Sequence, residues 1–327
     1  MRRFGKVGRI VLGAWLMVGA VALSACSGAS ARREGVAVHP QSQLEPLRDS
    51  LTNIAAGCPG EVGIALITDF GDTLTVNNEA KYPLMSVFKL HQAIALCDLF
   101  ERRSIPIDTV VTLDRSQLNP ETWSPMLKDF PVGRQIALPV RELMRYTLMQ
   151  SDNNASNYMF ETLCSVAATD SCVSKLIPRE SFQLKVTEAD MWSDHSLCYE
   201  NRSSPLGAAQ LINRLFTDPK LLPANGDFLR TTLQECKTGT DRIVAPLLGK
   251  EGVVVAHKTG SGFRDADGVL SAHNDVAYVM LPDGRHYALA VFIKDYRGSE
   301  KEAATVIARI SAAVYDFLII IPKTTRA

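Results

Sequence analysis

Strand-like segments lie at both ends of this 327-residue chain, whereas its middle carries the spacing of helices. Five segments have the apolar pattern and the flanking turn residues of strands: 61–68, 73–77, 253–257, 272–281 and 286–294. Strands this far apart in sequence must meet in the fold to bury their apolar faces. The simplest architecture is one sheet built from both ends of the chain, with a helical part inserted between them.

Apolar residues recur every three or four positions in seven further segments, which predicts helices. These segments are 43–56, 86–100, 139–149, 155–164, 205–216, 228–236 and 301–318. Pro139 suits the first turn of its helix, where a missing N–H costs nothing. We expect the helices at the two ends of the chain to cover the sheet. The cleft between the sheet and the helical part is then the default place for a site.

The N-terminus is typical of an export signal. A basic start precedes an apolar run, residues 10–23, that is too short to span a bilayer comfortably. The run ends in Leu23-Ser24-Ala25-Cys26, which resembles the cleavage box of bacterial lipoproteins. We expect a signal peptide over residues 1–25, a lipid on Cys26 and a flexible tether over residues 26–41. The alternative is an ordinary signal peptide cut near Ala25. Either way the protein is expected on the periplasmic side, and Ser27 favours the outer membrane by resemblance to lipoprotein sorting rules.

Charge and cysteine content narrow the function classes. Acidic and basic residues balance at 35 each, so nothing indicates a nucleic-acid partner. Cys97 lies in an apolar helical pattern and is expected to be a buried free thiol. Cys164 and Cys172 could pair, although spacing cannot fix connectivity. No Cys/His spacing resembles a metal site, and we expect neither metal nor cofactor.

Ser86 and Lys89 stand three residues apart at the start of a predicted helix. Residues at this spacing share a helix face, so the hydroxyl and the amine should lie side by side. A serine hydroxyl needs an adjacent base to act as a nucleophile, and a lysine can serve if burial or a nearby cation lowers its pKa. A capping serine beside a solvated lysine gives the same pattern, so support must come from elsewhere in the chain.

Two further motifs follow. Ser151-Asp152-Asn153 comes just after a predicted helix and could also be a turn that caps the next one. Lys-Thr-Gly occurs at 237–239 and again at 258–260. The first copy follows a helical pattern, so we interpret its glycine as a helix stop. Only the second copy extends a strand, along which a peptide-like substrate could lie, and we assign the site to it.

Glu188 is the candidate catalytic carboxylate. It lies in residues 185–204, a polar stretch without sustained periodicity, which predicts a long ordered loop. Long loops in compact domains are usually functional. Asp190, Asp194 and Glu200 compete with Glu188 for the role.

The motifs Ser-x-x-Lys, Ser-Asp-Asn and Lys-Thr-Gly, in this order, mark class A β-lactamases and penicillin-binding proteins. The chain resembles a class A β-lactamase over residues 42–320 and is most similar to the CfxA-type cephalosporinases. Stretches that carry this closeness include 58–61, 85–92, 122–128, 150–157, 236–239 and 256–262. The resemblance implies an α+β fold of the β-lactamase/transpeptidase type, with an antiparallel sheet flanked by terminal helices and an inserted all-α domain. The sheet domain would comprise residues 42–82 and 218–327, the helical domain residues 83–217, with the active site at their interface.

The resemblance also implies the chemistry, which is hydrolysis of the β-lactam amide, with cephalosporins preferred, through an acyl-enzyme on Ser86. Lys89 would take or relay the serine proton. Glu188 would activate water. Ser151 and Lys258 would pass a proton to the departing lactam nitrogen.

Further positions would bind the substrate, a small β-lactam. Backbone N–H groups of Ser86 and Ser261 would form the oxyanion hole. Asn153 would hold the substrate's side-chain amide, and Arg242 would help to bind its carboxylate. The substrate-binding set is Trp123, Asn153, Arg242, Thr259, Gly260 and Ser261.

The loop around Glu188 departs from the common class A pattern. Trp192 replaces the asparagine that normally helps to hold the hydrolytic water. Val186 and Asn201 stand where an arginine and an aspartate usually form an ion pair, so the loop must be held in another way. A roomier mouth that suits bulky cephalosporins is expected.

Two alternatives share the motifs. A D,D-peptidase would lack the deacylating glutamate, so Glu188 discriminates against it. A β-lactam-sensing domain would be tethered to a signalling segment. Met85 and Gly262 occupy the positions of the cysteine pair found in carbapenem-hydrolysing relatives, which predicts poor carbapenem turnover. We expect a monomer.

Overall fold

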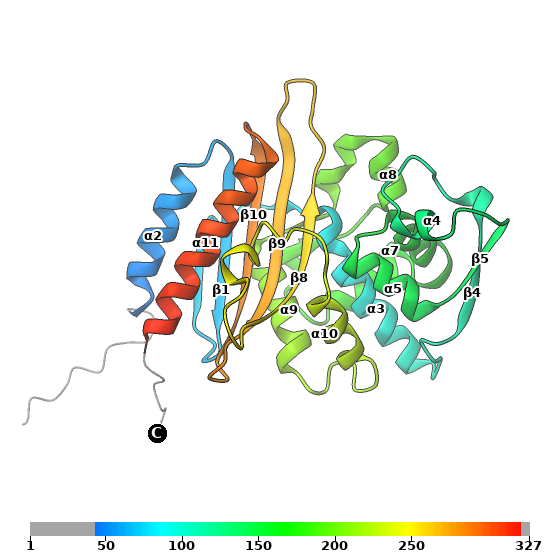
Figure 1. Ribbon diagram of the computed structural model, residues 1–327, viewed down its shortest axis with the longest axis horizontal. Coiled ribbons are helices and arrows are strands. Elements are labelled where there is room, and N and C mark those ends of the chain that lie inside the picture. The colour runs from blue at the N-terminus through cyan, green and yellow to red at the C-terminus, as the bar shows by residue number, and fades with distance from the viewer. Residues whose placement is uncertain (1–42, 322–327) are drawn as a thin grey trace, which may run out of the picture. The chain divides into compact units, whose positions relative to one another are not determined.

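The computed structural model describes residues 43–321, and the predicted signal peptide, the tether and Cys26 lie outside them. A five-stranded antiparallel sheet has the order β2–β1–β10–β9–β8 (Figure 1). Its strands are β1 (Glu61–Thr68), β2 (Thr73–Val76), β8 (Val254–Ser261), β9 (Leu270–Met280) and β10 (His286–Tyr296). The first strand pairs with the last, from Glu61 opposite Lys294 to Thr68 opposite Tyr287. The predicted α+β fold, with one sheet built from both ends of the chain, is confirmed.

Two terminal helices, α2 (Glu45–Ala56) and α11 (Glu300–Ile320), lie side by side against one face of the sheet (Figure 1). Their apolar positions at helical spacing face inward and include Leu47, Leu51, Ile307 and Ile310. Ser299 starts α11 with a capping box, in which its hydroxyl and the Glu302 carboxylate each accept a backbone N–H of the other residue. Both helices were predicted from the spacing and are confirmed.

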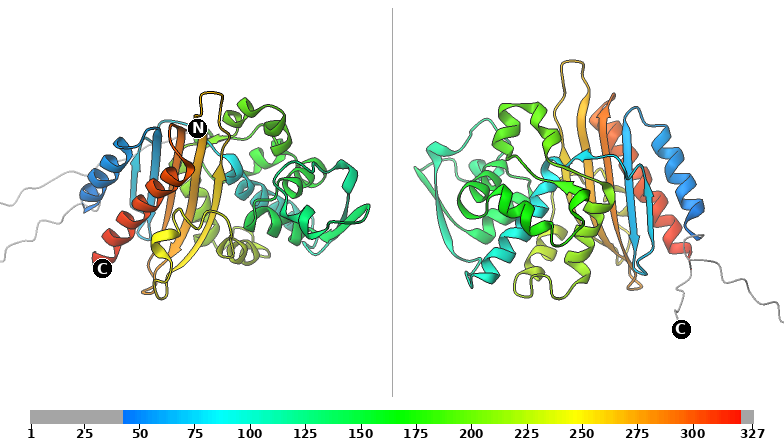
Figure 2. Two further views of the ribbon diagram at one scale, coloured as in Figure 1. Left: turned by 45° about the horizontal axis from the view of Figure 1, so that its top comes forward. Right: turned by 180° about the vertical axis from the view of Figure 1, so that it is seen from behind.

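The opposite face of the sheet packs against α9 (Pro205–Thr217), which contacts β1, β9 and β10 and is seen from behind in Figure 2. The same core contains α3 (Phe88–Arg102), the helix that begins just after Ser86. Most of its residues are buried, on all sides of the helix. A helix of this kind belongs at the centre of a domain, and it gives the Ser86 region a rigid base.

The remaining helices of the described part are short. They are α4 (Pro125–Asp129), α5 (Val140–Met149), α6 (Asn153–Tyr158), α7 (Val166–Val173), α8 (Glu188–Ser193) and α10 (Gly226–Gln234). The helix predicted over 155–164 changes character at Met159 and continues as a π-helical turn to Leu163. Pro139 ends a strand and stands before the first turn of α5, so its predicted place inside that turn was wrong by one position.

Short strands in the middle of the chain were not predicted. β4 (Val110–Asp114) pairs with β5 (Gln135–Pro139), and most of their residues are partly or fully exposed, so the apolar signal was weak. β3 (Tyr82–Pro83), β7 (Arg202–Ser203) and β6 (Phe182–Gln183) form a second small sheet. The proposed boundary between a sheet domain and a helical domain stays a prediction.

All six cysteines in the described residues are free thiols. Cys97 is fully buried, as predicted. Cys164 and Cys172 do not pair with each other. Cys164 lies beside the Thr169 hydroxyl, and Cys172 donates to Asp98. The structure therefore contains no disulfide between the two cysteines for which one was considered.

Candidate active site

Ser86 lies in a 3₁₀ turn, Met85–Val87, that leads directly into α3, and Lys89 lies in the first turn of that helix. The ammonium Nζ of Lys89 donates to Oγ of Ser86 at 3.1 Å, as the spacing predicted. The Lys89 side chain is fully buried. Met85 has a φ of +46°, a left-handed conformation that is strained for a residue with a side chain. Strain of this kind one residue before Ser86 is typical of functional sites.

The Ser-Asp-Asn motif forms the turn between α5 and α6. Nζ of Lys89 donates to the carbonyl of Ser151 at 2.9 Å and to Oδ1 of Asn153 at 2.6 Å. Ser151 also has a positive φ, +60°. The motif therefore caps a helix, through Asp152, and also surrounds the buried lysine with acceptors. The capping interpretation is confirmed, whereas the catalytic role of the motif stays a prediction.

Asp152 has a structural part in the site that the sequence analysis missed. Its buried carboxylate accepts from the backbone N–H groups of Met126 and Ala155 and from the hydroxyl of Ser124, each at 2.8 Å. Burial raises the pKa of Asp152, and these three hydrogen bonds oppose that rise. The residue ties the segment that follows Trp123 to the start of α6.

The second Lys-Thr-Gly copy lies on β8, as predicted. Nζ of Lys258 donates to Oγ of Ser151 at 3.1 Å and to the carbonyl of Thr259 at 2.9 Å. Burial lowers the pKa of Lys258 to about 7. Gly260 explains how β8 comes so close to Ser86. A Cβ on this residue would lie 2.5 Å from the Leu84 carbonyl oxygen, so a larger residue would push the strand away.

The first Lys-Thr-Gly copy was interpreted too simply. α10 ends at Gln234, and Gly239 lies well beyond the helix end, so it is not the predicted helix stop. The hydroxyl of Thr238 lies 2.7 Å from that of Thr259. Thr238 is therefore part of the site. This could be seen only once the loop after α10 and strand β8 were placed side by side.

Glu188 reaches the centre of the site from the N-terminus of α8. Its Oε1 accepts from Oγ of Ser86 at 2.9 Å and forms an ion pair with Nζ of Lys89 at 2.8 Å. The side chain is buried. Ser86, Lys89 and Glu188 are therefore in mutual contact, and the carboxylate is placed to accept the serine proton.

The competing acids are engaged elsewhere. Asp190 caps α8 by accepting from the N–H of Thr187 at 2.8 Å. Asp194 caps the 3₁₀ helix His195–Glu200. Glu200 forms an ion pair with Lys185 at 2.7 Å. Glu188 alone of the four contacts Ser86, and the loop predicted over 185–204 contains two short helices.

A cleft of about 310 Å³ opens beside Ser86. It is lined by Met85, Ser86, Trp123, Ser151, Asn153, Glu188, Trp192, Thr238, Arg242, Thr259, Ser261 and Phe263. The guanidinium of Arg242 donates to Oγ of Ser261 at 2.6 Å and to the carbonyl of Asn274 at 2.6 Å. Trp123 is about half exposed, and its indole N–H donates to the carbonyl of Gln150. The lining of the cleft thus includes a cation and aromatic rings.

Comparison with known proteins agrees with this geometry. Residues 46–318 match the beta-lactamase enzyme family. A class A β-lactamase structure from Bacteroides cellulosilyticus DSM 14838 superposes with a TM-score of 0.78 at 32% identity, covering 85% of this chain and 98% of that one. The chain belongs to the class A β-lactamases. It is therefore a hydrolase that acts on β-lactams and confers resistance to them.

Two curated relatives of this β-lactamase show how far the similarity extends. A β-lactamase from Phocaeicola vulgatus is 56% identical over 272 residues, which are 83% of this chain and 84% of the relative. The extended-spectrum β-lactamase PER-1 from Pseudomonas aeruginosa is 30% identical over 84% of this chain and 88% of its own length.

The loop over residues 185–204 has no ion pair between positions 186 and 201. The Asn201 side chain holds it instead. Its Oδ1 accepts from the N–H groups of Lys185 and Val186, at 2.8 and 3.1 Å. Its Nδ2 donates to the carbonyl of Val186 at 2.8 Å. The Asn201 side chain is fully buried, so one neutral amide closes the base of the loop.

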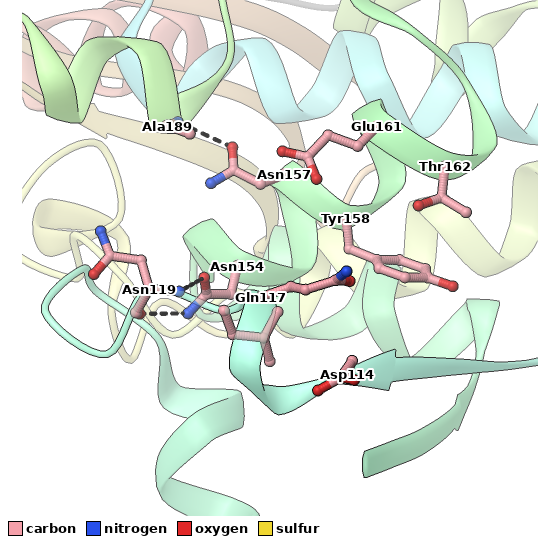
Figure 3. Close-up of a pocket in the computed structure, with 10 residues that line it drawn as sticks. Asp114, Gln117, Asn119, Asn154, Asn157, Tyr158, Glu161, Thr162 and Ala189 are labelled. Carbon is pink, nitrogen blue, oxygen red and sulfur yellow. Dashed lines mark hydrogen bonds between the residues drawn. The ribbon is translucent and has the colours of Figure 1, made fainter. Parts of the chain in front are cut away.

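The outer side of the loop has a second support, drawn in Figure 3. The N–H of Ala189 donates to Oδ1 of Asn157 on α6 at 3.1 Å. These residues line a small polar pocket that shares no lining residue with the Ser86 cleft. Nearby, the Asn154 side chain is hydrogen-bonded to the backbone of Asn119 in both directions. Helix α8 is thus fixed against α6 from behind Glu188.

Trp192 lies at the mouth of the cleft, where it is partly exposed. Its indole meets the ring of His195 edge-on, with centroids 6.4 Å apart. His195 in turn stacks on Phe263 at 3.8 Å. Three rings therefore connect the loop to the turn after β8. Within residues 43–321, no group of three or more His, Cys, Asp or Glu side chains is placed to hold a metal ion.

Proposed function

We propose that this β-lactamase works through an acyl-enzyme on Ser86. The observation that carries the proposal is the contact among Ser86, Lys89 and Glu188, in which Oγ lies within 3.1 Å of both an ammonium and a carboxylate oxygen. Glu188 accepts the serine proton as Oγ attacks the lactam carbonyl. Lys89 stabilises the negative charge that develops on Oγ.

The oxyanion hole consists of the N–H groups of Ser86 and Ser261. Gly262 donates its N–H to Ala272 on β9 at 2.8 Å. Because N–H groups alternate in direction along a strand, the N–H of Ser261 points away from β9. Ser261 also lines the cleft. Each such donor contributes about 3–4 kcal/mol to stabilisation of the transition state.

Ser151 passes a proton to the lactam nitrogen as the ring opens. Its hydroxyl lies 3.1 Å from Nζ of Lys258, which supplies the proton and the positive charge. The substrate carboxylate binds where the hydroxyls of Thr238, Thr259 and Ser261 meet Arg242. The amide of the substrate side chain binds Asn153.

Release of the acyl group requires Glu188 to activate water. This step separates the proposal from a D,D-peptidase, which has no such carboxylate and stays acylated, and from a β-lactam-sensing domain. The support is that Glu188 alone of four nearby acids contacts Ser86.

The test uses purified protein and a chromogenic cephalosporin, with Ser86→Ala, Glu188→Gln and the control Asp190→Asn. We expect no acyl adduct and no turnover with Ser86→Ala. Glu188→Gln should accumulate an acyl-enzyme visible by mass spectrometry, whereas Asp190→Asn should turn over. Sustained turnover by Glu188→Gln would move the deacylation role to another residue.

We also propose a preference for cephalosporins over penicillins and carbapenems. The support is Trp192 at the cleft, in place of the usual asparagine, and the name of the relative PER-1, an extended-spectrum β-lactamase. At Gly262 a Cβ would lie 2.3 Å from the Ser271 hydroxyl, so a larger residue does not fit at this position. Equal kcat/KM for penicillins and oxyimino-cephalosporins would refute the preference. Fast imipenem hydrolysis would refute the exclusion of carbapenems.

Anchoring through Cys26 on the periplasmic side of the outer membrane is a further proposal from the sequence. Lipid attachment should raise the mass of the mature N-terminal peptide. Cys26→Ser should then move activity from the membrane fraction to the soluble fraction. Activity that stays soluble in the unmodified protein would exclude the anchor. We further propose that the protein is a monomer. Light scattering on a soluble form that begins near residue 42 tests this.

A further inference from the structure

A second group of reactive side chains lies behind the Lys-Thr-Gly strand and has no part in the hydrolytic mechanism. It consists of Cys236, in the loop after α10, His257 on β8 and Asp275 on β9. Nδ1 of His257 lies 3.0 Å from a carboxylate oxygen of Asp275. The Cys236 thiol and His257 interact, because each shifts the pKa of the other. We call this set the Cys236 relay.

The order of groups in the Cys236 relay is that of a thiol, a base and an orienting carboxylate. In such an arrangement the carboxylate fixes the imidazole, and the imidazole takes the thiol proton. Asp275 is fully buried and also accepts the N–H of Ile243 at 3.1 Å, so its position is fixed. His257 is buried as well, whereas Cys236 is partly exposed.

The charges around the thiol favour its ionised form. Burial opposes ionisation, but His257 and Lys258 outweigh this effect and lower the pKa of Cys236. Burial likewise disfavours the imidazolium, but Asp275 and Cys236 raise the pKa of His257. Arg242 is the further cation that interacts with Cys236.

The other partly exposed thiols provide a comparison within the same chain. Burial raises the pKa of Cys58 to about 11 and that of Cys172 to about 12, and neither group has a histidine partner. Reactivity follows the thiolate, so these cysteines should be inert where Cys236 reacts.

We propose that Cys236 is a modification site for small disulfides and similar soft electrophiles, with His257 and Asp275 as the residues that activate it. The thiolate attacks one sulfur of the disulfide. A new S–S bond forms, the old one breaks, and the departing thiolate takes up the proton that His257 holds. The product is a mixed disulfide on Cys236 and one free thiol.

Such an adduct would disturb the hydrolytic site through Thr238. The sulfur of Cys236 lies 3.5 Å from Oγ1 of Thr238, which in turn contacts Oγ1 of Thr259 at 2.7 Å. Thr238 and Thr259 both line the cleft. The adduct also removes the negative charge that supports the ammonium of Lys258. Modification of Cys236 should therefore slow β-lactam hydrolysis.

The first experiment needs no variant. The folded enzyme is treated with hydroxyethyl disulfide, a small neutral reagent, at pH 7, and samples are quenched with acid over time. Peptide mass mapping then gives the rate at each cysteine. We expect Cys236 to react at least about tenfold faster than Cys58 and Cys172. A Cys236 rate no higher than theirs overturns the proposal.

Two variants test the relay itself. His257→Gln and Asp275→Asn each remove one part of it, and we expect the Cys236 rate to fall by about tenfold in His257→Gln and by less in Asp275→Asn. Circular dichroism shows whether each variant is folded. An unchanged rate in a folded His257→Gln protein overturns the role of the relay.

A third measurement connects modification to hydrolysis. Turnover of a chromogenic cephalosporin should fall in step with the fraction of Cys236 modified and should return with dithiothreitol. The same reagent should leave the rate of Cys236→Ser unchanged. Rapid modification without loss of turnover keeps the site but overturns its control of hydrolysis. The labelling rates do not depend on how the enzyme hydrolyses β-lactams, so the two proposals can fail separately.

Discussion

The centre of the active site and the loop that closes it are stabilised in different ways. At the centre, two fully buried lysines on α3 and β8 contact three other segments, which carry Ser86, Glu188 and the turn Ser151–Asn153. The loop, residues 185–204, depends on one buried amide, Asn201, and on aromatic contacts at its outer end. Changes at the centre, Glu188 included, should therefore abolish the chemistry, and changes elsewhere in the loop should alter stability and substrate preference.

The largest effect is expected at the centre, from Lys258→Ala. The variant loses the charge that faces Ser151 and the substrate carboxylate, and kcat/KM should fall by about 10²–10³. The chain offers a matched control in the other Lys-Thr-Gly copy. Lys237 is exposed, so the kcat/KM of Lys237→Ala should stay within about twofold of that of the unmodified enzyme. Equal losses in both variants would contradict the assignment of the site to the second copy.

The next effect concerns the contact between the two regions. His91 on α3 is fully buried, its ring lies 5.8 Å from that of Phe182 at the base of the loop, and burial lowers its pKa to about 4. The unfolded chain takes up this proton near pH 6.5 and the folded protein only near pH 4. The unfolded state therefore binds more protons in this window, and the free energy of unfolding falls as the pH falls through it.

The loss at pH 4 should be about 3 kcal/mol from His91 alone. Burial also lowers the pKa of His273 to about 3, so this residue adds a second proton to the slope. In His91→Leu the free energy of unfolding should fall less steeply with pH, because one fewer proton is taken up on unfolding. Denaturant unfolding at a series of pH values measures both slopes. An identical slope in the variant would show that His91 is not the group that titrates.

Within the loop, Asn201→Ala should lower the free energy of unfolding by about 2 kcal/mol, because two partly buried N–H groups lose their acceptor. Deacylation should slow as well, since the base of the loop positions Glu188. Asn157→Ala is the matched control. It removes one exposed hydrogen bond, to Ala189, and should cost less than about 1 kcal/mol. Equal costs would mean that burial of Asn201 is not what matters.

The centre could be predicted from the sequence because its chemistry depends on short motifs. Ser86 with Lys89, and Lys258 with Ser151, are where the spacing and the resemblance placed them. The paired strands at the two ends were also predictable, since their apolar runs are long and buried.

The remaining features could not be predicted because they depend on pairing between distant segments. The contact of Thr238 with Thr259 joins the two Lys-Thr-Gly copies. The local pattern around the first copy had suggested only a helix stop. The strand pair β4–β5 is mostly exposed and leaves little apolar signal. Asn201 replaces an ion pair through three hydrogen bonds to its own loop, which residue type alone does not reveal.

The smallest effect is expected at the outer end of the loop. Trp192, His195 and Phe263 form a row of ring contacts at the mouth of the cleft, and an aromatic pair contributes about 0.5–1.5 kcal/mol. Trp192→Ala should therefore change KM for bulky cephalosporins by a few-fold and leave kcat for small penicillins unchanged. His195→Ala removes the middle ring and should have the same effect. Because the rings act as one unit, the double variant should be no worse than either single variant. Additive effects would show that Trp192 contacts substrate directly, and the loop would then contribute to recognition without being held by the ring contacts.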